Sequence, residues 1–252
     1  MDNHLEFALL GSPEVRLNGT PVTGFRSAKA QALLYYLAAT KRPQPRLVLA
    51  GLFWGGVDDH YARRNLNRTL SNLTDLVGDH LAITRQTLAF DRSQPYWLDV
   101  EAFEAAATIT PAGGRVDAMT QAVELYRGDF LEGFYIHDAP EFEQWVSAER
   151  TRLREVMLQV LHALADHYAA HGDLGRAIDY VRQGLKLEPW REEAHRQLMV
   201  LLAKSGQRSA ALAQYELCRQ TLAAELNVEP DAATLDLVAR IRIGELDQGT
   251  RG

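Results

Sequence analysis

The stretch that decides the fold is DDHYARRNLNRTLSNLTDLVG, residues 58–78. At 100° per residue, its apolar side chains recur on one side of a helix and its polar side chains gather on the other. The apolar side consists of Ala62, Leu66, Leu70, Leu73 and Val77. The polar side consists of Arg64, Asn67, Arg68, Ser71 and Asn72. The pattern predicts an amphipathic helix with one buried stripe.

The polar side of this helix carries groups that can read nucleic acid. Arginine offers a planar fork that fits guanine, and asparagine offers a donor and an acceptor that fit adenine. Arg63 sits nearer the apolar side, from which it either reaches a phosphate or pairs with an acid. A solvated amphipathic helix explains the same pattern equally well when the helix is taken alone. The residues expected to contact base edges are Arg64, Asn67, Arg68 and Ser71.

The segments before this helix predict a sheet and two shorter helices. Apolar residues alternate over 5–9 and again over 15–17, just before the turn dipeptide Asn18-Gly19, which indicates a small antiparallel sheet. Ser27 is placed to cap a helix that continues to Ala38. A short apolar helix is expected over 47–54.

A hairpin is expected directly after the long helix, because apolar residues at 81–83 and 88–90 flank the polar tip 84–87. The order of sheet, helix, short helix, long helix and hairpin indicates a helix-turn-helix with a β wing. The long helix would then enter the major groove, and the wing would approach the DNA backbone. A small α+β domain without a ligand is the alternative. The residues expected to contact the backbone are Lys29, Arg46, Arg63, Arg85 and Thr87.

Charge is divided unevenly along the 252 residues, whose net charge is −6. Residues 1–100 hold 11 Lys and Arg against 9 Asp and Glu, whereas residues 101–252 hold 16 against 24. Local charge governs attraction to phosphate more than the total does. Contact with nucleic acid is therefore expected from the first part of the chain.

Composition and motifs argue against a secreted protein, a membrane protein and an enzyme. The single cysteine, Cys218, excludes an intrachain disulfide, and the chain has neither a long apolar run nor a signal pattern. We expect a cytoplasmic protein. His167 and His171 lack a third metal ligand at helical spacing, and no phosphate-binding loop is present. We expect no catalytic residue, no metal and no cofactor.

The second half of the chain repeats itself with a period of 34 residues. Leu164, Gly172 and Ala177 recur as Leu198, Gly206 and Ala211. This is the tetratricopeptide period, in which the glycine lies in a turn and the alanine lies where two helices cross closely. Such repeats usually present a face to a protein partner. Aromatic residues between 130 and 145 are expected in the core of the same helical domain.

These patterns predict a mainly α fold with a small β component, in two domains. The first, residues 1–98, is an N-terminal winged helix-turn-helix, and the second, residues 99–246, is an all-α domain of tetratricopeptide-like repeats. A polar tail is expected over 247–252. A helix is expected from Asp99 to Ala107, and a loop over 110–114.

Several runs of sequence carry a resemblance to a known family. They are FRSAKAQALLYYLAAT (25–40), LAGLFWGG (49–56), ARRNLNRTLSNL (62–73) and YWLDVEAFEAA (96–106). Together they resemble the winged helix of the bacterial SARP or AfsR-type regulators, which is similar to the OmpR/PhoB DNA-binding domain. The run YRGDFLEG (126–133), followed by Trp145, resembles the opening of the bacterial transcriptional activator domain. The resemblance covers about residues 5–243.

The resemblance implies a transcription activator that binds double-stranded promoter DNA, often at direct repeats, and recruits RNA polymerase. It also implies self-association on tandem sites. Two alternatives from other classes stay open at this point. One is a tetratricopeptide-like scaffold whose winged helix binds protein, and the other is the regulatory N-terminal part of a larger signalling ATPase.

Overall fold

The computed structural model describes residues 3–108 and 115–246. The chain divides into two compact units, one formed by residues 1–109 and 124–154 and the other by 110–123 and 155–252. The loop expected over 110–114 and the polar tail expected over 247–252 lie outside the described residues. The first unit extends beyond residue 98 because 124–154 packs with it.

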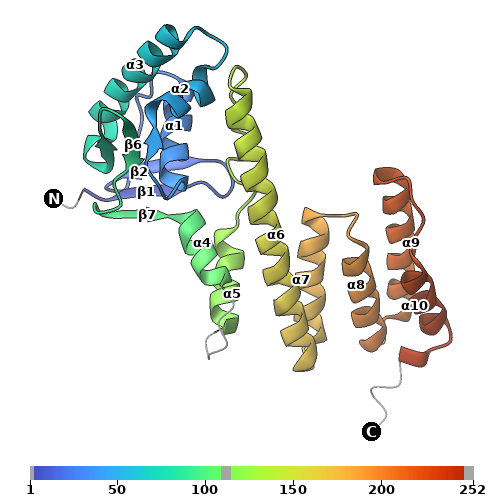
Figure 1. Ribbon diagram of the computed structural model, residues 1–252. Helices are drawn as coiled ribbons and strands as arrows, with labels where there is room; N and C mark the ends of the chain where they lie inside the picture. Colours follow the sequence, from blue (N-terminus) through green and yellow to red (C-terminus); the bar gives the residue numbers. More distant parts are fainter. Residues whose placement is uncertain (1–2, 109–114, 247–252) are drawn as a thin grey trace. The chain divides into compact units, whose positions relative to one another are not determined.

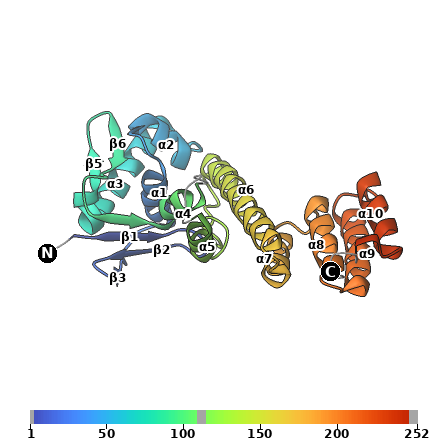
Figure 2. The same ribbon diagram turned by 90° about the horizontal axis from the view of Figure 1, so that it is seen from below.

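The first unit begins with the expected sheet (Figure 2). Strands β1 (Leu5–Ala8), β2 (Glu14–Leu17) and β3 (Thr20–Pro21) pair antiparallel. The turn between β2 and β3 uses Asn18 and Gly19 with φ of 52° and 77°, which suits these two residue types. A fourth strand, β7 (Tyr96–Leu98), pairs parallel with β1. The sequence pattern did not predict this parallel strand.

Three helices follow the sheet in the predicted order (Figure 1). They are α1 (Ala28–Ala39), α2 (Arg46–Trp54) and α3 (Asp59–Val77), and the 3-10 turn η1 (Gly78–His80) closes α3. Ser27 caps α1, since its side chain accepts a hydrogen bond from the Ala30 amide. The expected hairpin consists of β5 (Leu81–Ile83) and β6 (Thr87–Phe90), and β4 (Gln44–Pro45) adds a third strand beside β6.

Helix α4 spans Asp99–Ala107, as the sequence predicts, and is joined to β1 through a buried carboxylate. Asp99 is 1% exposed and accepts hydrogen bonds from the Leu9 and Leu10 amides at 2.7 and 2.8 Å. Burial raises the pKa of Asp99, while these amides and Arg127 oppose the rise. The carboxylate therefore fixes the start of α4 against the end of β1.

Residues 124–154 complete the core of the first unit with aromatic side chains. The ring of Phe142 lies 5.1 Å from that of Phe53 on α2, and the ring of Trp145 lies 4.7 Å from that of Tyr36 on α1. Phe142 and Phe53 are fully buried. Phe142 and Trp145 were expected in the core of the helical domain, but they pack in the first unit. They cover the apolar face that α1 and α2 present.

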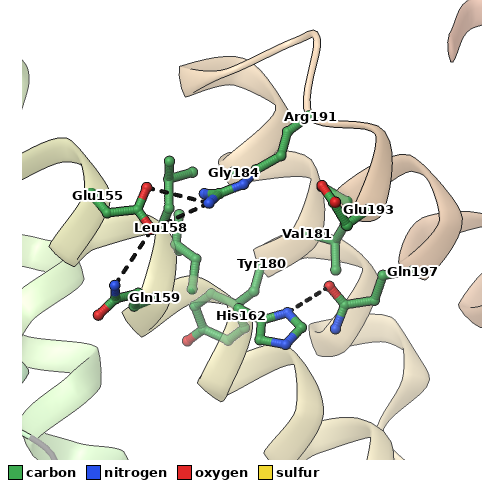
Figure 3. Close-up of a pocket in the computed structure, with 12 residues that line it drawn as sticks. Glu155, Leu158, Gln159, His162, Tyr180, Val181, Gly184, Arg191, Glu193 and Gln197 are labelled. Atoms are coloured by element: carbon green, nitrogen blue, oxygen red, sulfur yellow. Dashed lines mark hydrogen bonds and ion pairs between the residues drawn. The ribbon is translucent and has the colours of Figure 1, made fainter. Parts of the chain in front are cut away.

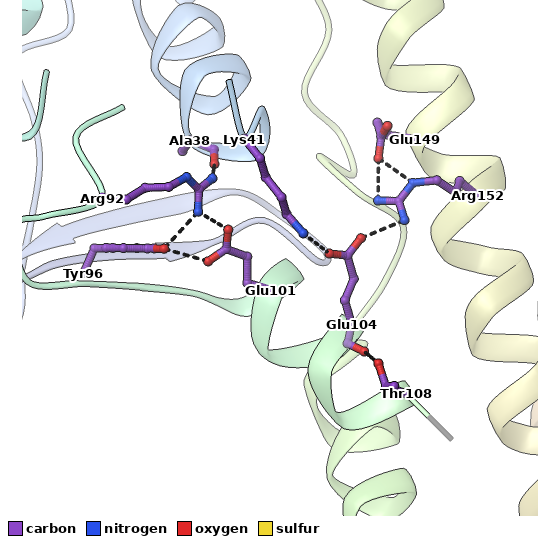
Figure 4. Close-up of polar contacts among 9 residues, drawn as sticks. All are labelled: Ala38, Lys41, Arg92, Tyr96, Glu101, Glu104, Thr108, Glu149 and Arg152. Carbon is purple, nitrogen blue, oxygen red and sulfur yellow. Dashed lines mark hydrogen bonds and ion pairs between the residues drawn. The ribbon is translucent and has the colours of Figure 1, made fainter. Parts of the chain in front are cut away.

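Two polar clusters also tie the first unit together (Figure 4). In one, Arg92 donates to the carbonyl of Ala38 at 2.8 Å and to the Tyr96 hydroxyl at 2.9 Å, and it pairs with Glu101. In the other, Glu104 accepts from Lys41 and Arg152 at 3.0 and 2.7 Å. Burial raises the pKa of Glu104, but these two hydrogen bonds outweigh it and hold the pKa below its usual value.

The second unit is helical throughout the residues that the structure describes. Helices α5 (Arg115–Leu125) and α6 (Pro140–Ala170) contribute to both units. They are followed by α7 (Leu174–Leu187), α8 (Glu192–Lys204), α9 (Arg208–Glu225) and α10 (Ala232–Arg242), as Figure 1 shows.

The predicted 34-residue repeat is confirmed. Gly172 and Gly206 occupy the turns before α7 and α9 with φ of 81° and 78°, a conformation that favours glycine. Ala177 and Ala211 are completely buried where α7 and α9 pack on their neighbours. Leu164 and Leu198 are buried on the first helix of each pair. The pairs therefore have the small-residue contacts that the period predicts.

The described part of the chain contains no helix that combines the length and apolar character needed to span a bilayer. Within the same residues, no group of three or more metal-ligating side chains is found. Cys218 is buried on α9, and burial raises the pKa of its thiol to about 11. The thiol is therefore protonated at neutral pH, as expected for a structural cysteine.

Candidate nucleic-acid interface

Helix α3 presents the amphipathic surface that its sequence predicts. Its first turn is fixed by Asp58, whose side chain accepts a hydrogen bond from the His60 amide at 2.8 Å. The predicted apolar stripe is buried in full: Ala62, Leu66, Leu70, Leu73 and Val77. The exposed residues of the helix include Arg63, Arg64, Asn67, Arg68 and Ser71. Arg63, which the spacing places nearer the apolar side, is exposed as well.

Asn72 is not part of the exposed side, and its assignment to that side was wrong. It is 4% exposed. Its side-chain oxygen accepts from the Arg26 amide at 2.9 Å, and its nitrogen donates to the Gly24 carbonyl at 3.2 Å. A buried amide side chain needs such partners, because unpaired polar groups are costly inside a protein. Asn72 therefore holds the loop before α1 against α3.

Arg46 connects three parts of the surface. Its backbone amide donates to the Gln86 carbonyl at 2.9 Å, and its guanidinium donates to the Thr84 carbonyl at 3.3 Å and to the side-chain oxygen of Asn67. The start of α2, the wing tip and α3 are thereby joined. Since the oxygen of Asn67 already accepts from Arg46, Asn67 holds Arg46 in place in this structure.

The wing tip is closed by threonine hydroxyl groups. The Thr84 amide donates to the Thr87 carbonyl at 2.9 Å, and the Thr87 amide donates to the Thr84 hydroxyl at 2.8 Å. These bonds explain how the hairpin forms without the usual glycine or asparagine. Arg85 is exposed at the tip, whereas Thr87 is half-buried within the turn.

Lys29 lies in a different environment from the arginines. Its ammonium group lies 2.8 Å from the Asp138 carboxylate and 5.6 Å from the centre of the Trp54 ring, and its side chain is 13% exposed. The hydrogen bond from Lys29 lowers the pKa of Asp138. Lys29 and Arg68 both line a hollow of about 420 Å³. The structure thus brings Lys29 near α3 but gives its charge a partner.

The cations of the first unit separate into two groups. The first group forms ion pairs, except for Arg150, which donates to backbone carbonyls; the paired cations are Arg16, Arg26, Lys29, Lys41, Arg92, Arg127, Arg152 and Arg154. Among the described residues of this unit, the remaining cations without an ion pair are Arg42, Arg46, Arg63, Arg64, Arg68 and Arg85. All six belong to α3, the wing, the connection between α1 and α2, or the first residue of α2.

Arg42 is the member of this group that sequence reasoning missed. It is exposed and lies two residues before β4. A single basic residue in a turn forms no periodic pattern, so its position becomes visible only once β4 is seen to pair with β6.

Comparison with known proteins agrees with this architecture. Residues 98–242 match the family model described as bacterial transcriptional activator domain. The chain is 28% identical over 249 residues to the regulatory protein AfsR of Streptomyces griseus, covering 94% of this chain and 24% of that protein. It is 26% identical over 254 residues to the transcriptional regulatory protein EmbR of Mycobacterium tuberculosis, covering 96% of this chain and 64% of that protein.

The fold is also similar to a solved structure, Mycobacterium tuberculosis EmbR in complex with a low-affinity phosphopeptide. The TM-score is 0.71 at 25% identity, over 95% of this chain and 65% of that chain. The chain thus spans between about a quarter and just under two thirds of the length of these relatives. Since the family model covers more than half of the 252 residues, the chain belongs to the bacterial transcriptional activator domain family.

Proposed function

We propose that this chain is a sequence-specific, DNA-binding transcription activator of the cytoplasm, without catalytic activity. The observation that carries the proposal is the group of arginines without ion pairs on α3 and the wing. Leaving so many cations without acidic partners on one set of elements is expected where phosphate supplies the opposite charge. The similarity to AfsR and EmbR, both named as regulators, supports the same function.

Within this interface we assign different tasks to the exposed residues. Arg64, Arg68 and Ser71 lie at successive turns of α3 and would face base edges, where arginine contacts guanine through two hydrogen bonds. Arg63 and Arg85 would contact phosphates, together with Arg42. Arg46, Asn67 and Thr87 would hold the wing in register with α3 and add contacts of their own. Lys29 would contribute least, because its charge is already paired with Asp138.

The second unit would supply contacts with protein. Its alanines at 177 and 211 are buried by packing between helices, which leaves the outer faces of the repeats for partners. We propose RNA polymerase and a second copy of this chain as the partners, the latter when two copies bind tandem sites. A head-to-tail contact would match sites that repeat in the same orientation.

The test begins by selecting the preferred site from random duplexes with the full chain. Binding of that site is then measured by fluorescence anisotropy for Arg64→Ala, Arg68→Ala and a matched control, Arg16→Ala. Arg16 is an exposed arginine of the same unit, but it is paired with Glu14 on β2. Loss of a two-bond base contact should weaken specific binding by about 1–3 kcal/mol, and the control should bind as the wild type does. Equal affinity of all four proteins would exclude α3 as the reading element.

Self-association needs a separate experiment on duplexes that carry one half-site or two. The full chain should bind two half-sites cooperatively, since contact between neighbouring copies raises the effective concentration of the second. Residues 1–154, which contain the first unit, should bind each half-site independently. Equal cooperativity of the fragment and the full chain would place the coupling in the first unit or in the DNA.

A further inference from the structure

A pocket of about 300 Å³ lies among α6, α7 and α8 in the second unit (Figure 3). Its buried part is apolar and includes Leu158, Val181 and Gly184. Its outer part carries charged and amide side chains. Pockets of this kind, with an apolar floor and a few polar groups at the rim, are typical of sites for small molecules, and this volume is near the lower end of their range.

Gly184 adds open space to the pocket because it has no side chain. Gly184 lies within α7 with a helical backbone, where glycine is unfavourable compared with alanine. A Cβ atom here would lie 3.6 Å from Cδ2 of Leu158 and 4.0 Å from Cδ1 of Leu161, which are ordinary contacts. The backbone therefore tolerates a side chain, but a long one would occupy the space. The glycine keeps the pocket open without being needed for the turn or the helix.

The one cation that lines the pocket is already engaged. Arg191 contacts both carboxylate oxygens of Glu155 at 3.2 and 3.3 Å (Figure 3). It also lies 3.8 Å from the carboxylate of Glu188. An anionic ligand would have to compete with these two carboxylates for the guanidinium group. It would also face a third carboxylate, that of Glu193.

Glu193, in contrast, forms only a long ion pair and is exposed to solvent. Its side chain is 76% exposed, and its nearest cation, Arg196, is 3.9 Å away. At the other end of the pocket, Nδ1 of His162 lies 3.1 Å from Oε1 of Gln197 (Figure 3). The side-chain nitrogen of Gln197 donates to the Asp166 carboxylate at 2.8 Å. This end is therefore polar and carries no free positive charge. The rim as a whole favours a positively charged group.

We propose that this pocket binds a small amphipathic cation, an apolar body that carries one amine. The apolar body would lie on Leu158, Val181 and Gly184, and the amine would lie toward Glu193. Because the lining comes from three successive helices, the bound molecule would hold α6, α7 and α8 together. Occupancy of the pocket requires no DNA.

The experiment titrates the full chain by isothermal calorimetry with two probes that share an indole body, tryptamine and indole-3-propionate. Tryptamine should bind at least about fivefold more tightly, because its amine is attracted by the carboxylates that repel the acid. Gly184→Leu should abolish binding of both probes, because the leucine side chain fills the pocket. Far-UV circular dichroism checks that this variant keeps its helices. Glu193→Gln keeps the shape and should weaken tryptamine by about two- to fivefold, the range of an exposed charge pair.

Glu216→Gln is the matched control. Glu216 is a half-exposed carboxylate of α9 that pairs with Arg219 three residues away, as Glu193 does with Arg196, and it does not line the pocket. It should leave tryptamine binding unchanged. The proposal is overturned if the wild-type chain does not bind tryptamine, if indole-3-propionate binds as well, or if Glu193→Gln and Glu216→Gln behave alike. Unchanged binding by folded Gly184→Leu would also overturn it.

Discussion

Phe142→Ala should destabilise the first unit, although residue 142 lies far from α3 in the sequence. Phe142 is fully buried, and its ring lies 5.1 Å from Phe53 on α2 and 5.6 Å from Trp145. Truncating a buried phenylalanine usually costs about 3–5 kcal/mol, because the apolar surface is lost and a cavity remains. That is a large share of the roughly 5–15 kcal/mol by which a domain is stable.

The assay is urea unfolding of residues 1–154, followed by tryptophan fluorescence, which reports on Trp54, Trp97 and Trp145. With a slope of about 2 kcal/mol per molar urea, the midpoint should fall by about 1.5–2.5 M. Gln144→Ala is the control, because Gln144 is exposed two residues away on the same helix. A midpoint for Phe142→Ala within about 0.5 M of the control would refute the reasoning. Residues 124–154 would then be dispensable for the first unit.

Other consequences can be measured with single substitutions. Arg85→Ala should lower affinity equally for selected and random DNA. The loss of one phosphate contact should also reduce the slope of log affinity against log salt by about 0.9. A changed sequence preference at an unchanged slope would mean that the wing reads bases. Gly184→Ala should stabilise the second unit by about 0.5–1 kcal/mol in urea unfolding, because alanine favours the helix. The added methyl group would lie 3.6 Å from Leu158, which is an ordinary contact. Destabilisation would show that the added methyl group does not fit beside Leu158. Burial lowers the pKa of His195 below its ordinary 6.5, so the unfolded chain binds this proton first as pH falls. The stability that neutral His195 contributes is therefore complete above pH 6.5 and is lost as pH falls through the folded pKa, at no more than about 1.4 kcal/mol per pH unit. His195→Gln should flatten this dependence in unfolding curves measured between pH 5 and 7.5, and an unchanged slope would assign it to other groups.

Local patterns predicted the elements of this protein well. The buried stripe of α3, the cap at Ser27 and the glycines at 172 and 206 depend on helical periodicity or on backbone conformation within a few residues. Such features are determined by residues that are close together in the sequence. The period of 34 residues added the order of the repeats, since each pair of helices packs mainly on the next.

Long-range contacts account for what the sequence did not predict. Lys29 looks like an ordinary exposed cation until Asp138, 109 residues later, is placed beside it. The side chain of Asn72 looks solvent-facing until the loop at Gly24 and Arg26 is packed against it. Likewise, the pattern around Phe142 and Trp145 shows that these residues are buried but does not identify the helices that cover them. Nothing local distinguishes one apolar partner surface from another.

The repeats of the second unit also limit how this protein can change in length. The alanines at 177 and 211 fill equivalent positions on α7 and α9, and each follows a glycine turn. A tandem duplication of residues 172–205 would therefore place a second α7 on α8 where α9 lies now, with the matching alanine at the crossing. Insertions or deletions of other lengths would turn the following helices out of register and expose their buried faces. Homologues that gain or lose sequence inside this unit should do so in steps of 34 residues, and each added copy would carry another Gly184 with it.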